Sequence, residues 1–270
     1  MKVVKLQKIA KDLRKIILDV YLKRGGHLST SLSCIDILVA LHFANFIKLN
    51  KKTYLKKNRN LLVVSKGHSD LSYYSLLYYL DIIDKKTLYN QNNKIVLGGH
   101  LDHKVPGVEL TTGSLGHGLG FAAGISLAEK INKKNYKQFV LLGDAECSEG
   151  SIWEAALFAK HNQLNNLVAI IDKNSIGASD YIDNFTSLTS LKEKWISFGW
   201  NVIIVNGHNF QDLIKSFKQL KNSKNPTVII ANTIKGKGIK FMQNDPIWHV
   251  KKLENVDDIQ NAKKDIDNYE

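Results

Sequence analysis

Two apolar segments of the sequence end in side chains that could bind a metal ion. Residues 139–142 are followed by Gly143 and Asp144, and residues 167–171 are followed closely by Asn174. If these segments are neighbouring parallel strands, Asp144 and Asn174 meet beyond the carboxyl edge of the sheet. With a backbone carbonyl they form a hard oxygen set, which suits Mg²⁺ or Ca²⁺ when phosphates complete the coordination. Ordinary turns, where Asp and Asn are common, explain the same residues without a metal.

A glycine-rich run at residues 110–120 could bring backbone N–H groups close to a phosphate or a planar ring. A nicotinamide-binding Rossmann motif would follow a strand directly, with an acidic residue about twenty positions further on. Here the preceding segment contains Pro106 and Gly107 and is not expected to be a strand. A nicotinamide oxidoreductase is therefore an alternative that NADH binding would test, and close helix packing is the structural alternative.

Several histidines lie beside glycine, beside tryptophan or in turns: His27, His68, His100, His103 and His249. Together with Lys66, Lys235 and Lys237 they would form a cationic, donor-rich rim for a phosphorylated polyol. His100 and His103 are also spaced as a zinc pair, but neither a cysteine nor a second cluster completes a tetrahedral site. His42 and His161 fall within expected helices and are interpreted as structural residues.

The elements that must position these residues alternate along the chain. Apolar runs at 61–64, 139–142, 167–171, 202–205 and 227–231 predict strands, and periodic patterns at 115–131, 152–162, 188–198 and 210–220 predict helices. This alternation predicts an α/β fold: a doubly wound, mostly parallel sheet with helices on both faces, forming a single domain over residues 1–270.

The amino-terminal segment predicts two further helices. Ile9, Leu13, Ile16, Ile17 and Val20 share one helical face, and the Gly25-Gly26 pair should end that helix. We expect Ser33 to cap a second helix that runs from residue 34 to about residue 45.

Composition excludes several classes of function. The net charge of +13 arises from 38 basic and 25 acidic residues, but only three of the basic residues are arginine. Because arginine is favoured for reading bases and clamping phosphates, we expect solvated lysines and no nucleic acid. The longest apolar stretches are shorter than a bilayer span, so no membrane is expected. Cys34 and Cys147 have no metal or redox spacing, which fits a reducing cytoplasm.

Six segments together resemble transketolases. They are residues 26–33, 65–68, 106–109 with the following Thr-Thr-Gly-Ser-Leu-Gly, 143–150, 172–176, and 235–238 with Trp248-His249. They occur in the family's order from about residue 5 to residue 255, and the resemblance is to the amino-terminal domain, which holds the cofactor diphosphate.

The resemblance implies a thiamine diphosphate site in which Asp144, Asn174 and the carbonyl of Ile176 bind Mg²⁺, with Ca²⁺ as the alternative. It implies cofactor contacts from a larger set: Lys66, His68, Gly113, Ser114, Leu115, Gly143, Asp144, Ala145, Glu146, Glu149, Asn174 and Lys235. His27, His100 and His249 resemble catalytic histidines that bind the sugar and move protons at its hydroxyls. Glu149 resembles the carboxylate that couples two cofactor sites across a dimer.

The sequence departs from the family pattern at Ala145, where glycine follows the aspartate, and at Leu101, His117 and Val250, where proline, glutamine and glycine are usual. If the backbone at residue 145 requires a positive φ, alanine costs on the order of 1 kcal/mol. The other three changes bear on the acceptor pocket more than on the cofactor.

Full-length enzymes of the family carry a second, pyrimidine-binding domain, whose glutamate activates the cofactor. The 270 residues lack it, and no carboxylate among them can be assigned that role. We therefore expect a split transketolase: this chain pairs with a C-terminal subunit, as a heterotetramer of two copies each, and transfers a two-carbon ketol unit from a ketose phosphate or related sugar to an aldose. The alternative is a noncatalytic thiamine-diphosphate-binding subunit in a specialised sugar pathway, which Ala145 favours and the retained histidines oppose.

Overall fold

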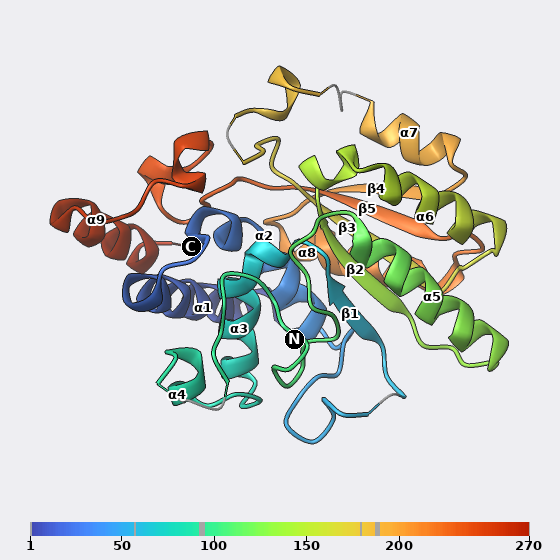
Figure 1. The fold of residues 1–270 in the computed structure, drawn as a ribbon, viewed down its shortest axis with the longest axis horizontal. Coiled ribbons are helices and arrows are strands. Elements are labelled where there is room, and N and C mark those ends of the chain that lie inside the picture. The colour runs from blue at the N-terminus through green and yellow to red at the C-terminus, as the bar shows by residue number, and fades with distance from the viewer. Residues whose placement is uncertain (1, 57, 92–94, 179, 187–189, 270) are drawn as a thin grey trace.

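The computed structural model describes residues 2–56, 58–91, 95–178, 180–186 and 190–269. Its centre is a sheet of parallel strands in the order β1-β2-β3-β5-β4 (Figure 1). The strands are β1 (Leu61–Val64), β2 (Gln138–Gly143), β3 (Leu167–Lys173), β4 (Asn201–Asn206) and β5 (Thr227–Asn232). The predicted strands and their parallel arrangement are confirmed, and β2 and β3 are neighbours.

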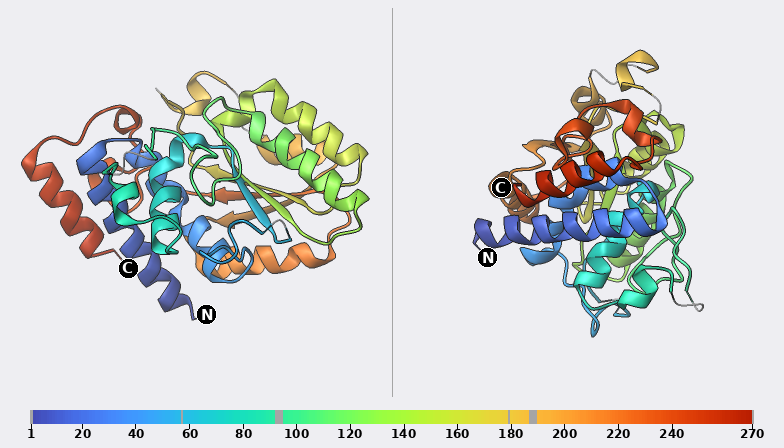
Figure 2. Two further views of the ribbon diagram at one scale, coloured as in Figure 1. Left: turned by 60° about the horizontal axis from the view of Figure 1, so that its bottom comes forward. Right: turned by 90° about the vertical axis from the view of Figure 1, so that its left-hand side faces the viewer.

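Helices cover both faces of the sheet, as predicted (Figure 1). One face packs against α1 (Val3–Arg24), α2 (Leu28–Phe43), α3 (Asp70–Tyr79) and α8 (Phe210–Gln219). The other packs against α5 (His117–Ile131), α6 (Gly150–His161) and α7 (Leu191–Ser197). Residues 188 and 189 of the predicted helix 188–198 lie outside the described residues. At the periphery are α4 (Lys85–Leu88) and α9 (Val256–Asp267), and α9 lies alongside α1 (Figure 2).

The strands are apolar at consecutive positions because each face of the sheet has its own core. In β2, Phe139 and Leu141 pack with α1, α2 and α8, whereas Val140 and Leu142 pack with α5 and α6. Successive side chains of a strand point to opposite faces, so a strand buried on both sides needs an unbroken apolar run.

The predicted start of the second helix is wrong. α1 ends at Arg24, and Gly25 follows with φ +74°, as the glycine pair indicates. However, α2 begins at Leu28, and Ser33 is a buried residue inside it. The Ser33 hydroxyl bonds to the Asp172 carboxylate and the Thr30 carbonyl instead of capping a helix end. The bond to Asp172 is a tertiary contact, which a local sequence pattern does not reveal.

The sequence patterns predict neither α3 nor α9. In α3 the first eight residues are all buried, so its tyrosines, serines and leucines do not form one apolar stripe. Among the described residues, no helix combines the length and the hydropathy that crossing a membrane requires.

Candidate active site

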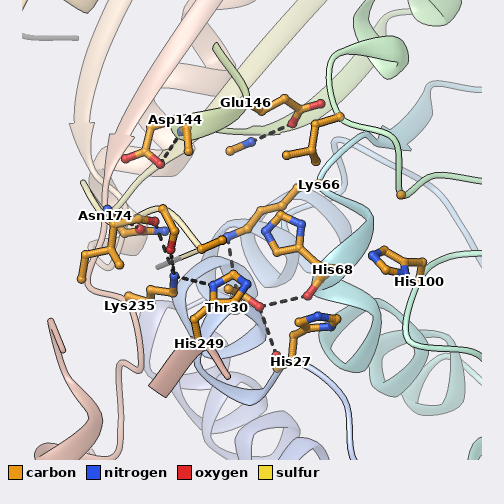
Figure 3. Close-up of a pocket in the computed structure, with 17 residues that line it drawn as sticks. His27, Thr30, Lys66, His68, His100, Asp144, Glu146, Asn174, Lys235 and His249 are labelled. Carbon is orange, nitrogen blue, oxygen red and sulfur yellow. Dashed lines mark hydrogen bonds between the residues drawn. The ribbon is translucent and has the colours of Figure 1, made fainter. Parts of the chain in front are cut away.

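A cavity of about 220 Å³ lies at the carboxyl edge of the sheet (Figure 3). Four strands contribute residues directly beyond their ends: Lys66 after β1, Asp144 after β2, Asn174 after β3 and Lys235 after β5. The full lining is His27, Thr30, Lys66, His68, His100, Gly113, Leu115, Gly143, Asp144, Ala145, Glu146, Asn174, Ile176, Gly177, Ala178, Lys235 and His249. This is the edge at which open α/β sheets bind ligands.

The cavity brings together the predicted cofactor-binding, metal-binding and catalytic residues except Ser114 and Glu149, which are exposed outside it. Of the predicted cationic rim, His103 and Lys237 do not line the cavity either. It adds Thr30, Gly177 and Ala178, which the sequence analysis did not single out. Thr30 lies within the motif at residues 26–33, and its hydroxyl contacts the carbonyls of His27 and His68. The motif at residues 26–33 was the sequence signal that could have pointed to Thr30. In the structure its hydroxyl connects the loops that carry His27 and His68.

The wall formed by β2 and β3 presents oxygen atoms. The two Asp144 oxygens accept from the N–H groups of Ala145 at 2.9 Å and Ser175 at 2.5 Å, and the Asn174 Oδ1 accepts from the Ile176 N–H at 3.1 Å. Burial raises the pKa of Asp144 to about 6 despite these hydrogen bonds. The cavity therefore holds a carboxylate that a bound cation would favour in its ionised form.

Glu146 joins this wall to neighbouring segments of the chain. Its carboxylate accepts from the N–H groups of Gly116 at 2.8 Å and Gly143 at 3.0 Å and from the Ser65 hydroxyl. Burial raises its pKa. The residue thereby ties the glycine-rich run to the end of β2.

Ala145 fits the site without backbone strain. Residues 145–148 form a short 3-10 helix, and the described non-glycine residues with positive φ do not include Ala145. The family's glycine is therefore not needed here for conformational freedom. Of the other departures, Leu101 is buried in the core, while His117 and Val250 are exposed.

A buried ion pair joins Lys66 to Asp172, the residue two positions before Asn174. Although burial opposes ionisation of Asp172, the Lys66 ammonium lowers the pKa of this carboxyl. The Lys66 side chain lines the cavity, but Asp172 already compensates its charge.

Lys235 has no comparable carboxylate within hydrogen-bond distance among the described residues. Its Nζ donates to the carbonyls of Gly177 at 2.7 Å and Ile176 at 3.4 Å and contacts Nδ1 of His249 at 2.8 Å. Burial, and then the Lys66 charge, lowers the pKa of Lys235 to about 7. An anionic ligand would therefore favour the ammonium form of this buried lysine.

The loop that carries Lys235 is held by a hydrogen-bond network centred on Asp36 of α2. Asp36 bonds both guanidinium nitrogens of Arg14, at 2.8 and 2.7 Å, and Nδ1 of His208 at 2.7 Å. Nε2 of His208 accepts from the N–H of Ile234 at 2.9 Å. This chain of contacts fixes the backbone next to Lys235.

Four histidine rings, those of His27, His68, His100 and His249, lie close together along the cavity (Figure 3). The His27 ring centroid lies 5.5 Å from that of His100, 5.8 Å from that of His249 and 5.9 Å from that of His68. Burial, followed by the charge of Lys235, lowers the pKa of His249 to about 3. Burial, followed by Lys66, also holds the pKa of His68 well below its usual value. Both rings are neutral near pH 7.

His103 does not join these rings. It is largely exposed and contacts the Thr111 hydroxyl at 2.6 Å, whereas His100 lines the cavity. The two residues therefore do not form a shared zinc site. Among the described residues, no three His, Cys, Asp or Glu side chains are placed to hold a metal ion. A cation here would need amide, carbonyl or ligand oxygens, which is the preference of Mg²⁺ and Ca²⁺.

The arrangement fits a diphosphate bound with a divalent cation. Oxygen ligands from Asp144 and Asn174 lie on one wall, and the Lys235 ammonium lies beside the carbonyl of Ile176. The glycine-rich run packs closely, since a Cβ on Gly113 would lie 3.3 Å from the His100 ring. The site thus places oxygen ligands for a cation, a buried lysine and the neutral rings of His68 and His249 within one cavity.

The family model described as the transketolase thiamine diphosphate binding domain matches residues 5–268, so fold and site define a thiamine-diphosphate-binding domain. The chain belongs to the transketolase family. It is 36% identical to one of the subunits of the apulose-4-phosphate transketolase of Phocaeicola vulgatus, over 88% of this chain and 85% of that protein. It is 35% identical to the 6-deoxy-6-sulfo-D-fructose transketolase subunit SqwG of Clostridium sp. (strain MSTE9), over 92% and 91%. The transketolase structure from Campylobacter jejuni superposes with a TM-score of 0.90 at 29% identity, covering 99% of this chain but 43% of that one.

Because its pKa is raised, Asp144 should lower the free energy of unfolding of the ligand-free chain by an amount that depends on pH. The folded-state pKa of about 6 lies above the unfolded value of about 3.9, so the folded chain binds the proton more tightly. This stabilising contribution is present below about pH 4 and is lost as the pH rises through about 6. Asp144→Asn should therefore raise the free energy of unfolding of the ligand-free chain at pH 8 by about 1–3 kcal/mol and leave it nearly unchanged at pH 4.

Urea unfolding at the two pH values measures this difference. Asp19→Asn is the control of opposite sign, because hydrogen bonds from Tyr89 and Lys23 lower the pKa of Asp19 despite its partial burial. That variant should lose stability at pH 8. An Asp144→Asn chain that is less stable than wild type at pH 8 but not at pH 4 would contradict the assigned direction.

Proposed function

We propose that the chain is the amino-terminal subunit of a two-chain transketolase. In this proposal it transfers a two-carbon ketol unit from a ketose phosphate, or a related sugar, to an aldose, in a reaction that depends on thiamine diphosphate and Mg²⁺. The observation that carries the proposal is the position of three histidines, His27, His100 and His249, along a cavity with Asp144 and Asn174 on its inner wall. Transketolase subunits are named among its relatives.

The inner wall is proposed to hold the cofactor's diphosphate and metal. Asp144, Asn174 and the carbonyl of Ile176 would bind Mg²⁺, which carboxylate, amide and carbonyl oxygens suit. Lys235 and His68 would contact the diphosphate, where the phosphate charge would stabilise the Lys235 ammonium. When bound, thiamine diphosphate supplies the carbon nucleophile that the sugar carbonyl requires.

The histidine side of the cavity is proposed to hold the sugar. When Lys235 is an ammonium, two of its N–H groups face the carbonyls of Ile176 and Gly177 and the third would donate to Nδ1 of His249. A neutral His249 would then carry its proton on Nε2 and could donate it to a sugar oxygen. His27 and His100 complete the set of groups that bind hydroxyls or move their protons.

Two observations support a partner subunit. The cavity of about 220 Å³ is smaller than the roughly 300–1,000 Å³ of a complete small-molecule site. The outer face of α5 and α6 also exposes large apolar side chains, with Phe121 42%, Phe158 43% and Leu157 59% accessible. We propose that a C-terminal subunit with a pyrimidine-binding domain completes the site in a heterotetramer. Exposed Glu149, at the start of α6, would then couple two sites across the assembly.

A noncatalytic subunit is less well supported than the sequence indicated. The departure at Ala145 favoured it, but the backbone there needs no glycine. Its histidines also converge on one cavity rather than lying apart.

The proposed metal site predicts that cofactor binding depends on Asp144. In the two-chain enzyme, Asp144→Ala should remove most of the Mg²⁺-dependent affinity for thiamine diphosphate, because the remaining ligands are uncharged oxygens. Isothermal titration calorimetry with Mg²⁺, and with EDTA as the metal-free control, measures this affinity. Unchanged binding by Asp144→Ala in Mg²⁺ would contradict the assigned ligand.

The proposed partnership predicts that the purified chain alone does not turn over xylulose 5-phosphate with an aldose phosphate and that adding the C-terminal subunit restores turnover. Leu157→Asp should raise the concentration of partner needed for half-maximal activity by at least about tenfold, because a charge would be buried in the contact. Val4→Asp, at a position on α1 that is 74% exposed, is the matched control and should not. Turnover by the chain alone would refute the partnership.

A further inference from the structure

A buried carboxylate that does not line the cavity lies next to His27. Asp70 is the first residue of α3, and its side chain is fully buried. Its Oδ2 bonds Arg24 at 3.1 Å, while its Oδ1 has no hydrogen-bond partner among the described residues. A buried acceptor of this kind is unusual and calls for a donor.

The ring of His27 offers a donor close to this oxygen. Nδ1 of His27 lies 3.7 Å from Asp70 Oδ1, and it too is buried and unpaired within the described part of the chain. The two atoms are complementary, because an imidazole N–H donates and an ionised carboxylate only accepts. Their separation exceeds a hydrogen bond by about 0.5 Å, and such contacts in catalytic sites often tighten when substrate binds.

We propose that Asp70 is a positioning residue that keeps the proton of His27 on Nδ1 and thereby leaves the Nε2 lone pair facing the cavity. The ring is 28% exposed while Nδ1 is buried, so its accessible edge is the one that carries Nε2. This inference rests on the proposed function, in which His27 acts on the sugar. There, the O–H bond of a sugar hydroxyl would break: the bonding electron pair stays on the oxygen and the proton passes to the Nε2 lone pair. The resulting imidazolium would donate from Nδ1 to Asp70 and later return the proton to a sugar oxygen.

Arg24 holds Asp70 in place. One guanidinium nitrogen bonds Asp70 and the other donates to the carbonyl of Gly98 at 3.2 Å. The guanidinium carbon also lies 5.6 Å from the centre of the Tyr74 ring. Because Arg24 is only 7% exposed and Asp70 is fully buried, each side chain compensates the burial of the other. This mutual dependence holds the Asp70 carboxylate in place beside His27.

His249 is fixed in the opposite way. Its Nδ1 lies 2.8 Å from the Lys235 Nζ, and when Lys235 is an ammonium it would donate to this atom and leave the His249 proton on Nε2. With ring centroids 5.8 Å apart, His27 would then offer an acceptor and His249 a donor to the same ligand. Two sugar oxygens on adjacent carbons could use this pair. One oxygen would give up its proton to His27, and the other would accept a hydrogen bond from His249.

The first test reads the His27 tautomer in the chain alone. Long-range ¹H–¹⁵N correlation spectra of ¹⁵N-histidine-labelled chain, with His27 assigned from a His27→Gln variant, should show the proton on Nδ1. In the double variant Arg24→Gln/Asp70→Asn, which leaves neither charge buried alone, a substantial Nε2–H population should appear. A proton on Nε2 in the wild-type chain, or an unchanged tautomer in a folded double variant, would overturn the proposal.

The second test uses the two-chain enzyme. The double variant should lower kcat about 10–100-fold, with the donor KM and the thiamine diphosphate affinity unchanged within about threefold, because it affects the state of one proton-transfer group. In a His27→Ala background the same double substitution should cost less than about twofold. Asp19→Asn, the loss of a paired carboxylate on α1, is the control and should leave kcat unchanged.

The two failures are distinguishable. An equal loss of kcat with and without His27 would mean that the Arg24–Asp70 pair is only structural, and the inference would be wrong. If the wild-type two-chain enzyme showed no ketol transfer, the proposed function would fail, while the His27 tautomer would still decide whether Asp70 fixes that proton.

Discussion

The buried carboxylate of Asp172 holds the site together. It is fully buried and binds the Lys66 ammonium after β1, the Ser33 hydroxyl of α2 and the Thr233 hydroxyl after β5. Three segments distant in sequence thereby meet at the end of β3. Removing one member of such a buried pair costs about 3–5 kcal/mol, because the other charge is left without a partner. The cavity walls depend on this contact before any ligand is considered.

Within those walls, Asp144 and Lys235 suit a ligand that carries both a positive and a negative charge. Burial raises the pKa of Asp144 to about 6 and lowers that of Lys235 to about 7, so each moves toward its neutral form. A divalent cation favours the ionised carboxylate, and a phosphate favours the ammonium. A metal–diphosphate would therefore relieve both costs at once, which neither ion alone would do. The same reasoning explains why cofactor binding should be coupled to protonation of the site.

Much of the fold and of the inner wall could be predicted because they follow from local patterns. Unbroken apolar runs indicated doubly covered strands, and parallel strands end at one edge, which placed Asp144 near Asn174. Features set by tertiary contacts could not be predicted in this way. Ser33 resembles a helix cap until its partner, Asp172, is known. The buried position of Asp70 depends on its ion pair with Arg24, 46 residues away, which no local pattern indicates.

The central claim is that the histidines divide their work between sugar and cofactor. The most direct measurement is a thiamine diphosphate titration combined with donor kinetics on the two-chain enzyme carrying His249→Ala, His100→Ala or His68→Ala. The first two should lower turnover or sugar affinity and leave the cofactor Kd nearly unchanged. Loss of general acid–base catalysis would lower turnover by about 10²–10⁴-fold. His68→Ala should instead raise the cofactor Kd. If all three variants lost cofactor affinity alike, the histidines would be structural supports of one loop cluster, and the account would be contradicted.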